Sequence, residues 1–182
     1  MTIAQQKLQQ NVAEYVLFVW QMEDLVRAVY FDHQSLQDFI RSYTPDDQAF
    51  NDEMKWFGDL MDTMKGERVE KRGHINEVHE ILFELFYLHN TLVNIICEKT
   101  YMDLYRTAKP NIEAYLERSG EKSTNEVEAC FVALYGLMLL RLRKEPVNDE
   151  TEAAMKTFSN LLARLSYHYR IMKQGEQHFN LN

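Results

Sequence analysis

Apolar residues recur at intervals of three or four positions through nearly the whole chain of 182 residues. This spacing places them on one side of an α-helix, and no segment shows the sustained alternation of a half-buried strand. With only 3 Pro and 6 Gly, the chain has few residues that end helices or form long loops. The sequence therefore predicts an all-α protein, a single-domain bundle of five to seven mostly antiparallel helices.

Capping residues, prolines and glycines set the expected helix boundaries. The predicted helices cover residues 3–30, 35–43, 45–65, 74–96, 101–115, 123–144 and 149–173. Thr44 is the expected N-cap before Pro45, and Ser123 to Glu126 reads as a capping box. Pro110 predicts either a kink or the start of a new helix. The domain is expected to span residues 1–175, followed by a frayed tail at 176–182.

Two predicted helices are apolar around most of their circumference. More than half of the circumference of the 74–96 helix is nonpolar, so this helix is expected near the centre of the bundle, enclosed on several sides. In the 123–144 helix, Ala129, Ala133 and Gly136 form a strip of small residues along which another helix can approach closely. The two cysteines, Cys97 and Cys130, lie in such apolar patterns, which favours buried thiols over redox or catalytic work.

The charge of the chain argues against nucleic acid as a partner. A formal net charge of −8 opposes the basic surface that phosphate binding requires. The acidic stretch from Pro45 to Asp62 is interpreted as a solvated helix face or, alternatively, as a docking site for a basic partner. The start of the chain lacks a secretion signal, and the longest apolar run, Ala129 to Leu140, is too short to span a membrane. A cytoplasmic location without membrane contact is expected.

Glu23 interrupts the apolar side of the first predicted helix, the side that also carries Leu8. A buried carboxylate requires a partner, and the candidates are Arg27, one turn later, and Arg141, on an apolar face of the 123–144 helix. The first interpretation is an interior ion pair that fixes helix packing. In the second, these three charged residues line a polar pocket with Trp20 as a wall, and catalytic acid–base work is a third.

Histidines are the other candidates for chemistry. His79 and His89 lie in the apolar arc of the 74–96 helix, about 15 Å apart along its axis, so the two cannot bind one ion. Both are expected to be hydrogen-bonded core residues, with a site completed by other helices as the alternative. His74 is expected to be a solvated or capping residue near the helix start. Since metal-ligand spacings, nucleophile motifs and phosphate loops are lacking, no catalytic residue, metal or cofactor is predicted.

Three motifs carry a resemblance to a known family. They are IAQQK with NVAEYVLFVWQMEDLVRA near the start, Gly73-His74, and NEVEACFVALYGLMLLRLRK at 125–144. Together they resemble an uncharacterised family of short bacterial helical proteins, each a single domain of about this length. The resemblance implies a bacterial, cytoplasmic, all-helical protein, and it implies no activity.

Two functions follow as hypotheses. The first is a non-enzymatic protein that associates with a protein partner or with itself as a homodimer, because four apolar side chains lie away from the main stripes of their helices: Leu17, Trp20, Phe31 and Trp56. A bundle with enough helices could instead bury all four. The second is a ligand-binding or metal-dependent enzyme with a site between helices. Its candidate ligand-binding residues are Trp20, Glu23, Arg27, His79, His89 and Arg141.

Overall fold

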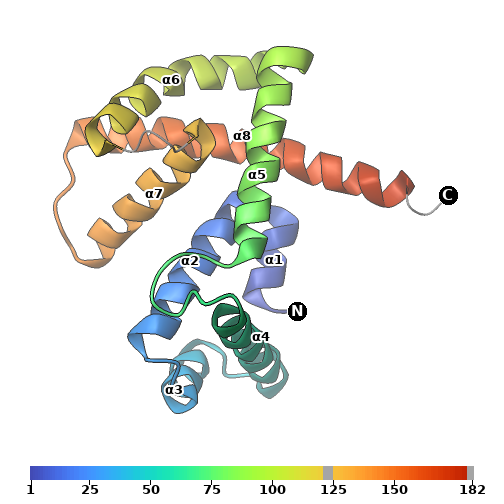
Figure 1. Cartoon of the computed structure of the whole chain (residues 1–182), viewed down its shortest axis with the longest axis vertical. Helices are drawn as coiled ribbons and strands as arrows, with labels where there is room; N and C mark the ends of the chain where they lie inside the picture. Colours follow the sequence, from blue (N-terminus) through green and yellow to red (C-terminus); the bar gives the residue numbers. More distant parts are fainter. Residues whose placement is uncertain (121–124, 180–182) are drawn as a thin grey trace. The chain divides into compact units, whose positions relative to one another are not determined.

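The computed structural model describes residues 1–120 and 125–179, which form α-helices and one π-helix and contain no strand (Figure 1). The elements are α1 (Ile3–Gln10), α2 (Val12–Ala28), α3 (His33–Tyr43), α4 (Asp47–Gly66), α5 (Asn76–Thr91), η1 (Leu92–Ile96), α6 (Lys99–Ser119), α7 (Glu126–Leu142) and α8 (Asp149–Phe179). The all-α prediction is confirmed. Eight α-helices appear in the described part where five to seven were expected, because the first predicted helix is divided in two.

The chain divides into two compact units, Met1–Ile81 and Leu82–Asn182, and each is described by itself. The prediction of one domain over residues 1–175 stays a prediction. In the first unit α1 contacts α2, and α4 contacts both α2 and α3. In the second unit α6, α7 and α8 pack against one another (Figure 1).

Asn11 separates α1 from α2. Its backbone is extended (φ −154°, ψ 99°), and its side-chain oxygen accepts hydrogen bonds from the amides of Ala13 and Glu14. An Asn side chain competes in this way for backbone groups that would otherwise continue a helix. The continuous 3–30 helix is therefore wrong, and Leu8, expected on the buried side, is exposed.

The starts of α3 and α4 each differ from the prediction by two positions. Asp46, and not Thr44, is the N-cap of α4, since its carboxylate accepts a hydrogen bond from the Ala49 amide at 2.8 Å. Asp32 caps α3 in the same way. The buried core of this unit includes Val16, Val19, Val26, Leu36, Ile40, Phe57, Met61, Met64, Ile75 and Val78.

In the second unit, α6 continues through Pro110 as one helix, so a new helix does not begin there. Pro110 is exposed. Because proline has no amide hydrogen, one carbonyl oxygen in the preceding turn lacks its helical partner, and this oxygen can bind water instead. Asn125 is the N-cap of α7, and the predicted N-cap Ser123 lies outside the described residues. α8 continues to Phe179, six positions beyond the predicted end at Lys173; positions 180–182 of the expected tail are not among the described residues.

Three expectations about the second unit are wrong in whole or in part. α5 is not enclosed on several sides, because Phe83 and Tyr87 are exposed on it. In the predicted strip of small residues, Ala129 and Ala133 are buried, but no atom of another element lies within 4 Å of the place where a Cβ of Gly136 would stand. Of the two cysteines, Cys130 is buried as predicted, whereas Cys97 is exposed. Cys97 adopts a left-handed conformation (φ 51°) where η1 turns into α6, which places it at a corner rather than within a helix.

Candidate functional site

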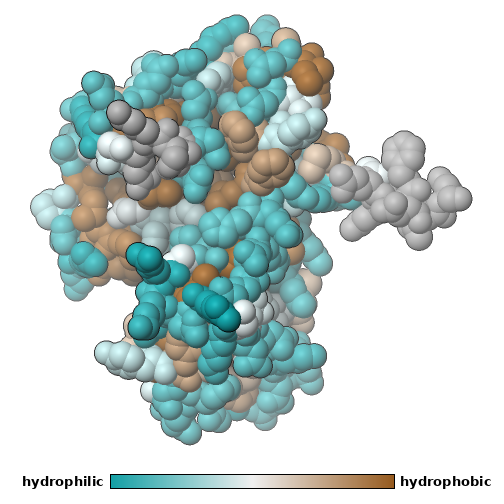
Figure 2. All heavy atoms as spheres, viewed as in Figure 1, coloured by the Kyte–Doolittle hydropathy of each residue, from teal (hydrophilic) through white to brown (hydrophobic). Residues whose placement is uncertain are grey.

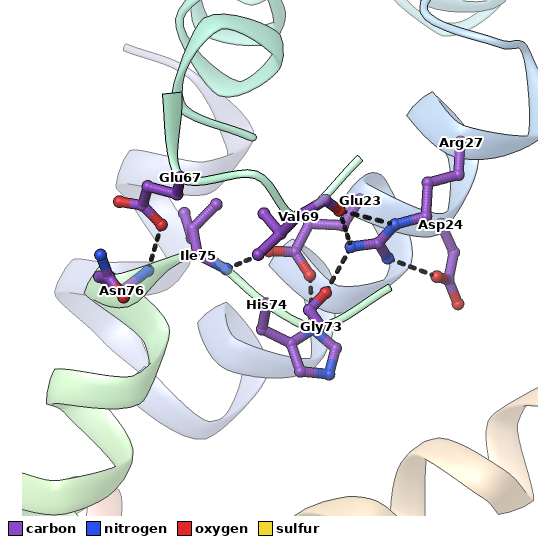
Figure 3. Close-up of polar contacts among 9 residues, drawn as sticks. All are labelled: Glu23, Asp24, Arg27, Glu67, Val69, Gly73, His74, Ile75 and Asn76. Carbon is purple, nitrogen blue, oxygen red and sulfur yellow. Dashed lines mark hydrogen bonds and ion pairs between the residues drawn. The ribbon is translucent and has the colours of Figure 1, made fainter. Parts of the chain in front are cut away.

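The carboxylate of Glu23 is completely buried, with 0% of the residue exposed. α2 carries it, and the segment that links α4 to α5 supplies both partners. Oε1 accepts a hydrogen bond from the Ile75 amide at 2.8 Å, and Oε2 lies 2.5 Å from Nδ1 of His74 (Figure 3). The predicted burial is confirmed, but the predicted cation is wrong. The partner is an imidazole 51 residues along the chain, and not a guanidinium.

Arg27, one turn after Glu23, binds the same connecting segment. Its guanidinium donates to the carbonyl oxygen of Val69 at 3.0 Å and to that of Gly73, and it pairs with Asp24 at 2.9 Å (Figure 3). These carbonyl groups belong to no helix or strand, so they need partners from elsewhere. Arg27 and Glu23 thus both bind the connecting segment. Arg27 donates to two of its carbonyl groups, and Glu23 accepts a hydrogen bond from its last amide.

Gly73 and His74 meet different requirements at the end of this segment. Gly73 has φ +89°, a conformation that side chains disfavour. Placing glycine there lets the chain turn so that His74 faces α2. The ring of His74 then stacks on Trp20, with centroids 4.4 Å apart and an interplanar angle of 17°. The stack and the carboxylate together fix the orientation of the imidazole.

His79, in the first turn of α5, is exposed, so the prediction of a core histidine is wrong at this position. Its ring centroid lies 6.2 Å from that of His74. The structure therefore brings Trp20, Glu23, Arg27 and His79 close to the segment that links α4 to α5. His74 completes this group of residues, but it was not among the predicted site residues. Its signal in the sequence was the Gly-His pair just before a helix, but the distance along the chain from Glu23 concealed the contact.

The remaining two candidates belong to the second unit, in separate groups. His89 is buried; its Nδ1 lies 2.7 Å from the Tyr101 hydroxyl and its Nε2 lies 3.6 Å from the Glu126 carboxylate. The prediction of a hydrogen-bonded core histidine is confirmed here. Arg141, by contrast, is exposed and pairs with Glu152 at 2.5 Å, so its expected place in an apolar face is wrong.

Burial and hydrogen bonding shift the pKa values of side chains around His89. The hydrogen bond from His89 lowers the pKa of Glu126, assisted by a hydrogen bond that the Tyr105 hydroxyl donates at 2.6 Å. Burial raises the pKa values of Tyr101 and Cys130, so both side chains stay neutral. A neutral, buried thiol is a poor nucleophile.

The four apolar residues that the sequence predicted at an interface are buried or half-buried. Trp20 is buried, and Leu17, Phe31 and Trp56 are half-buried; Trp56, for example, packs against Phe18 with ring centroids 5.7 Å apart. Several exposed apolar side chains lie instead on α5 and η1. Phe83 and Tyr87, one turn apart, are 70% and 68% exposed, and Ile95 and Ile96 are exposed at the corner before α6. These four residues are called the α5–η1 apolar face.

Figure 2, in the same view as Figure 1, shows hydrophobic surface at the end of α5, where η1 turns into α6. Within the described part of the chain no single helix is both long and apolar enough to cross a membrane; by length and composition, only the bent pair Asn76–Ile96 and Lys99–Ser119 passes.

The second unit also contains a pocket of about 390 Å³ between α6, α7 and the start of α8. Its walls include Tyr115, Ala133, Gly136 and Leu137, and Arg118 lies at its edge. This volume lies within the range of small-molecule sites. Among residues 1–120 and 125–179, no cluster of three or more His, Cys, Asp or Glu side chains has the arrangement of a metal site.

The fold and the site define the class of protein: it is all-helical, and it contains a buried carboxylate paired with an imidazole. A family model, domain of unknown function DUF4924, matches residues 1–176, and the chain belongs to this family. The match confirms the resemblance to an uncharacterised helical family. Comparisons with curated proteins and with solved structures give no match.

Proposed function

We propose that the protein works by association with a second copy of itself through the α5–η1 apolar face. The observation that carries the proposal is the exposure of Phe83 and Tyr87 on one side of one helix. Single exposed apolar residues are ordinary, but two large aromatic side chains one turn apart, with two exposed isoleucines further along, form the kind of patch that marks an interface.

The area of Phe83 and Tyr87 alone does not account for a stable dimer. Two aromatic side chains, each about two-thirds exposed, leave on the order of 250 Å² of apolar surface per copy. At roughly 25 cal/mol/Å², covering this area on both copies contributes on the order of 10 kcal/mol, which is comparable with the cost of association. Ile95 and Ile96 must therefore contribute to the interface for the dimer to form at micromolar concentration.

Light scattering over a range of protein concentrations tests the proposal. The wild type is expected to dimerise in the micromolar range, and the double variant Phe83→Glu, Tyr87→Glu is expected to remain monomeric. Tyr30→Glu is the matched control, because Tyr30 is an exposed aromatic residue outside the face. A wild type that is strictly monomeric at high micromolar concentration, or a double variant that dimerises as well as the control, would contradict the proposal.

Small-molecule binding is a second candidate function, favoured by the pocket between α6, α7 and α8. Cores of proteins are normally close-packed, yet Gly136 here faces open space in a pocket with apolar walls. A ligand with an apolar body fits such walls, and Arg118 and Glu150, which also line the pocket, can pair with charged groups on it.

A thermal-shift screen of metabolites tests this second function. Ligands that stabilise the wild type are expected to lose their effect in Gly136→Leu, which fills the pocket, and to keep it in Gly58→Ala, where the added Cβ also meets no neighbouring atom. If no ligand raises the melting temperature, or if Gly136→Leu leaves every shift unchanged, the pocket does not bind these molecules.

A further inference from the structure

We propose that His74 and His79 together bind a divalent transition-metal ion that prefers imidazole ligands, and that Glu23 is a positioning residue for His74. The site lies wholly within the first unit, and His79 precedes Phe83 of the α5–η1 apolar face by one turn of α5.

Glu23 determines which nitrogen of His74 is available. An ionised carboxylate only accepts hydrogen bonds, so the Nδ1–H group of His74 donates to Oε2. In the neutral ring, Nε2 then carries the lone pair that a metal requires. Figure 3 shows this second nitrogen on the edge of the ring away from Glu23. A histidine that binds a metal through one nitrogen commonly donates its other N–H to a carboxylate in this way.

The surroundings hold His74 ready for binding. Trp20 stacks on one face of the ring, and both oxygens of Glu23 are engaged, one by the ring and the other by the Ile75 amide. The imidazole therefore loses little rotational freedom when an ion binds. About a quarter of its side chain remains exposed (28%), which leaves access from solvent.

His79 supplies the second ligand at a suitable distance. Two imidazoles on one tetrahedral ion, with metal–nitrogen bonds of about 2 Å, have ring centroids roughly 5 Å apart. The observed separation is 6.2 Å. His79 is exposed, so its side chain can rotate to close the difference of about 1 Å without moving α5.

Two protein ligands leave the other coordination positions to water. Such a site is open and binds its ion more weakly than a closed structural site does. Imidazole suits zinc, copper and nickel better than magnesium or calcium, which prefer oxygen ligands. Selectivity for the first group over the second distinguishes the His74–His79 pair from general attraction of cations to an acidic protein.

Calorimetric titration of the full chain with zinc ions tests the proposal. One ion per chain is expected to bind, and magnesium at the same concentration should produce no signal. His79→Ala is expected to weaken binding at least tenfold; because this side chain is exposed, the variant should fold normally. His33→Ala is the matched control, since His33 is also an exposed histidine near a helix start.

The role of Glu23 needs a readout that loss of stability would not reproduce. Removing the carboxylate behind a metal-bound histidine typically costs 10–100-fold in affinity, and Glu23→Gln is expected to do so for zinc at a temperature where the variant is fully folded. In the wild type, imidazole ¹⁵N spectra should show zinc bound to Nε2 of His74 and not to Nδ1.

Three results would overturn the proposal: unchanged zinc affinity in His79→Ala, an equal loss of affinity in His33→Ala, or zinc on Nδ1 of His74. Because His79 lies one turn before Phe83 on α5, the zinc titration is also run on the variant Phe83→Glu, Tyr87→Glu, so that the metal site is tested independently of the proposed association.

Discussion

Each unit pairs a carboxylate with an imidazole, but the buried partner differs. In the first unit the acid is inside: Glu23 is fully buried, and His74 has 28% of its side chain exposed. In the second unit the imidazole is inside: His89 is buried, and Glu126 has 30% of its side chain exposed. The buried member of the pair is therefore the carboxylate in the first unit and the imidazole in the second.

The difference decides which atoms remain available. The buried Glu23 uses both oxygens inside the unit, so one nitrogen of His74 is left at the surface. The buried His89 has a partner near each nitrogen, the Tyr101 hydroxyl and the Glu126 carboxylate. A buried polar group must be satisfied on all sides, whereas a partly exposed one can leave an atom to solvent or to a ligand. Of these two pairs, the one in the first unit leaves an imidazole nitrogen accessible to a ligand.

Removing the buried acid should have the largest effect on stability. Glu23→Ala leaves both the Ile75 amide and His74 without their acceptor, and it should lower the free energy of unfolding by about 3 kcal/mol. Glu23→Gln keeps the size and one acceptor, so about half of that loss is expected. Urea denaturation measures both. A Glu23→Ala variant within about 1 kcal/mol of the wild type would show that the connecting segment does not depend on this side chain.

Removing the buried imidazole should have a somewhat smaller effect. His89→Ala creates a cavity and leaves the Tyr101 hydroxyl buried without its partner, which should cost about 2 kcal/mol. Tyr101→Phe removes only the hydroxyl and should cost about 1 kcal/mol. The same denaturation series applies, and equal losses in the two variants would mean that the hydrogen bond, and not packing of the ring, is what matters.

Glu126 in the second unit and Glu53 in the first unit should make the stability of the protein depend on pH in opposite directions. The pKa of Glu126 is lowered in the folded state, so its stabilisation is present above the ordinary value of 4.5 and is lost as pH falls through the lower value. Burial raises the pKa of Glu53, which has the reverse sign: as pH falls through the raised value, its protonation favours the folded state.

The unfolding free energy between about pH 3 and 7 measures this contrast. Relative to the wild type, Glu126→Gln should lose less stability on acidification, and Glu53→Gln should lose more. Equal profiles for the two variants would contradict the assignment of opposite shifts.

The smallest effect is expected at the surface. Arg141 pairs with Glu152 in solvent, and exposed pairs contribute little, so Arg141→Ala should change the unfolding free energy by no more than about 0.5 kcal/mol. This variant is the reference for the buried pairs. A loss comparable with that of His89→Ala would show that Arg141 has a role in the core after all.

Local patterns predicted the helices well and their surroundings poorly. The spacing of apolar residues gave every helical region, and an error arose where a polar side chain intervened, as Asn11 does between α1 and α2. The burial of Glu23 was predictable because its neighbours along α2 are apolar. Its partner was not, because helix geometry relates only residues three or four positions apart, and His74 reaches Glu23 by way of an irregular segment.

Exposure was the property that local patterns predicted least. The 74–96 region is apolar around most of its circumference, so enclosure was expected, yet Phe83, Tyr87 and His79 are exposed. Periodicity states which residues share a side of a helix. It does not state whether another helix covers that side.

The sequence by itself predicted the all-helical architecture and a carboxylate on an apolar side of a helix near the start of the chain, because both follow from the spacing of apolar residues along single helices. The tertiary structure decided which group neutralises that carboxylate, which histidine keeps a nitrogen at the surface and which apolar face lacks cover. Those outcomes depend on the direction in which connecting segments such as residues 67–75 return the chain, and backbone turns of this kind are set by the packing of the whole unit.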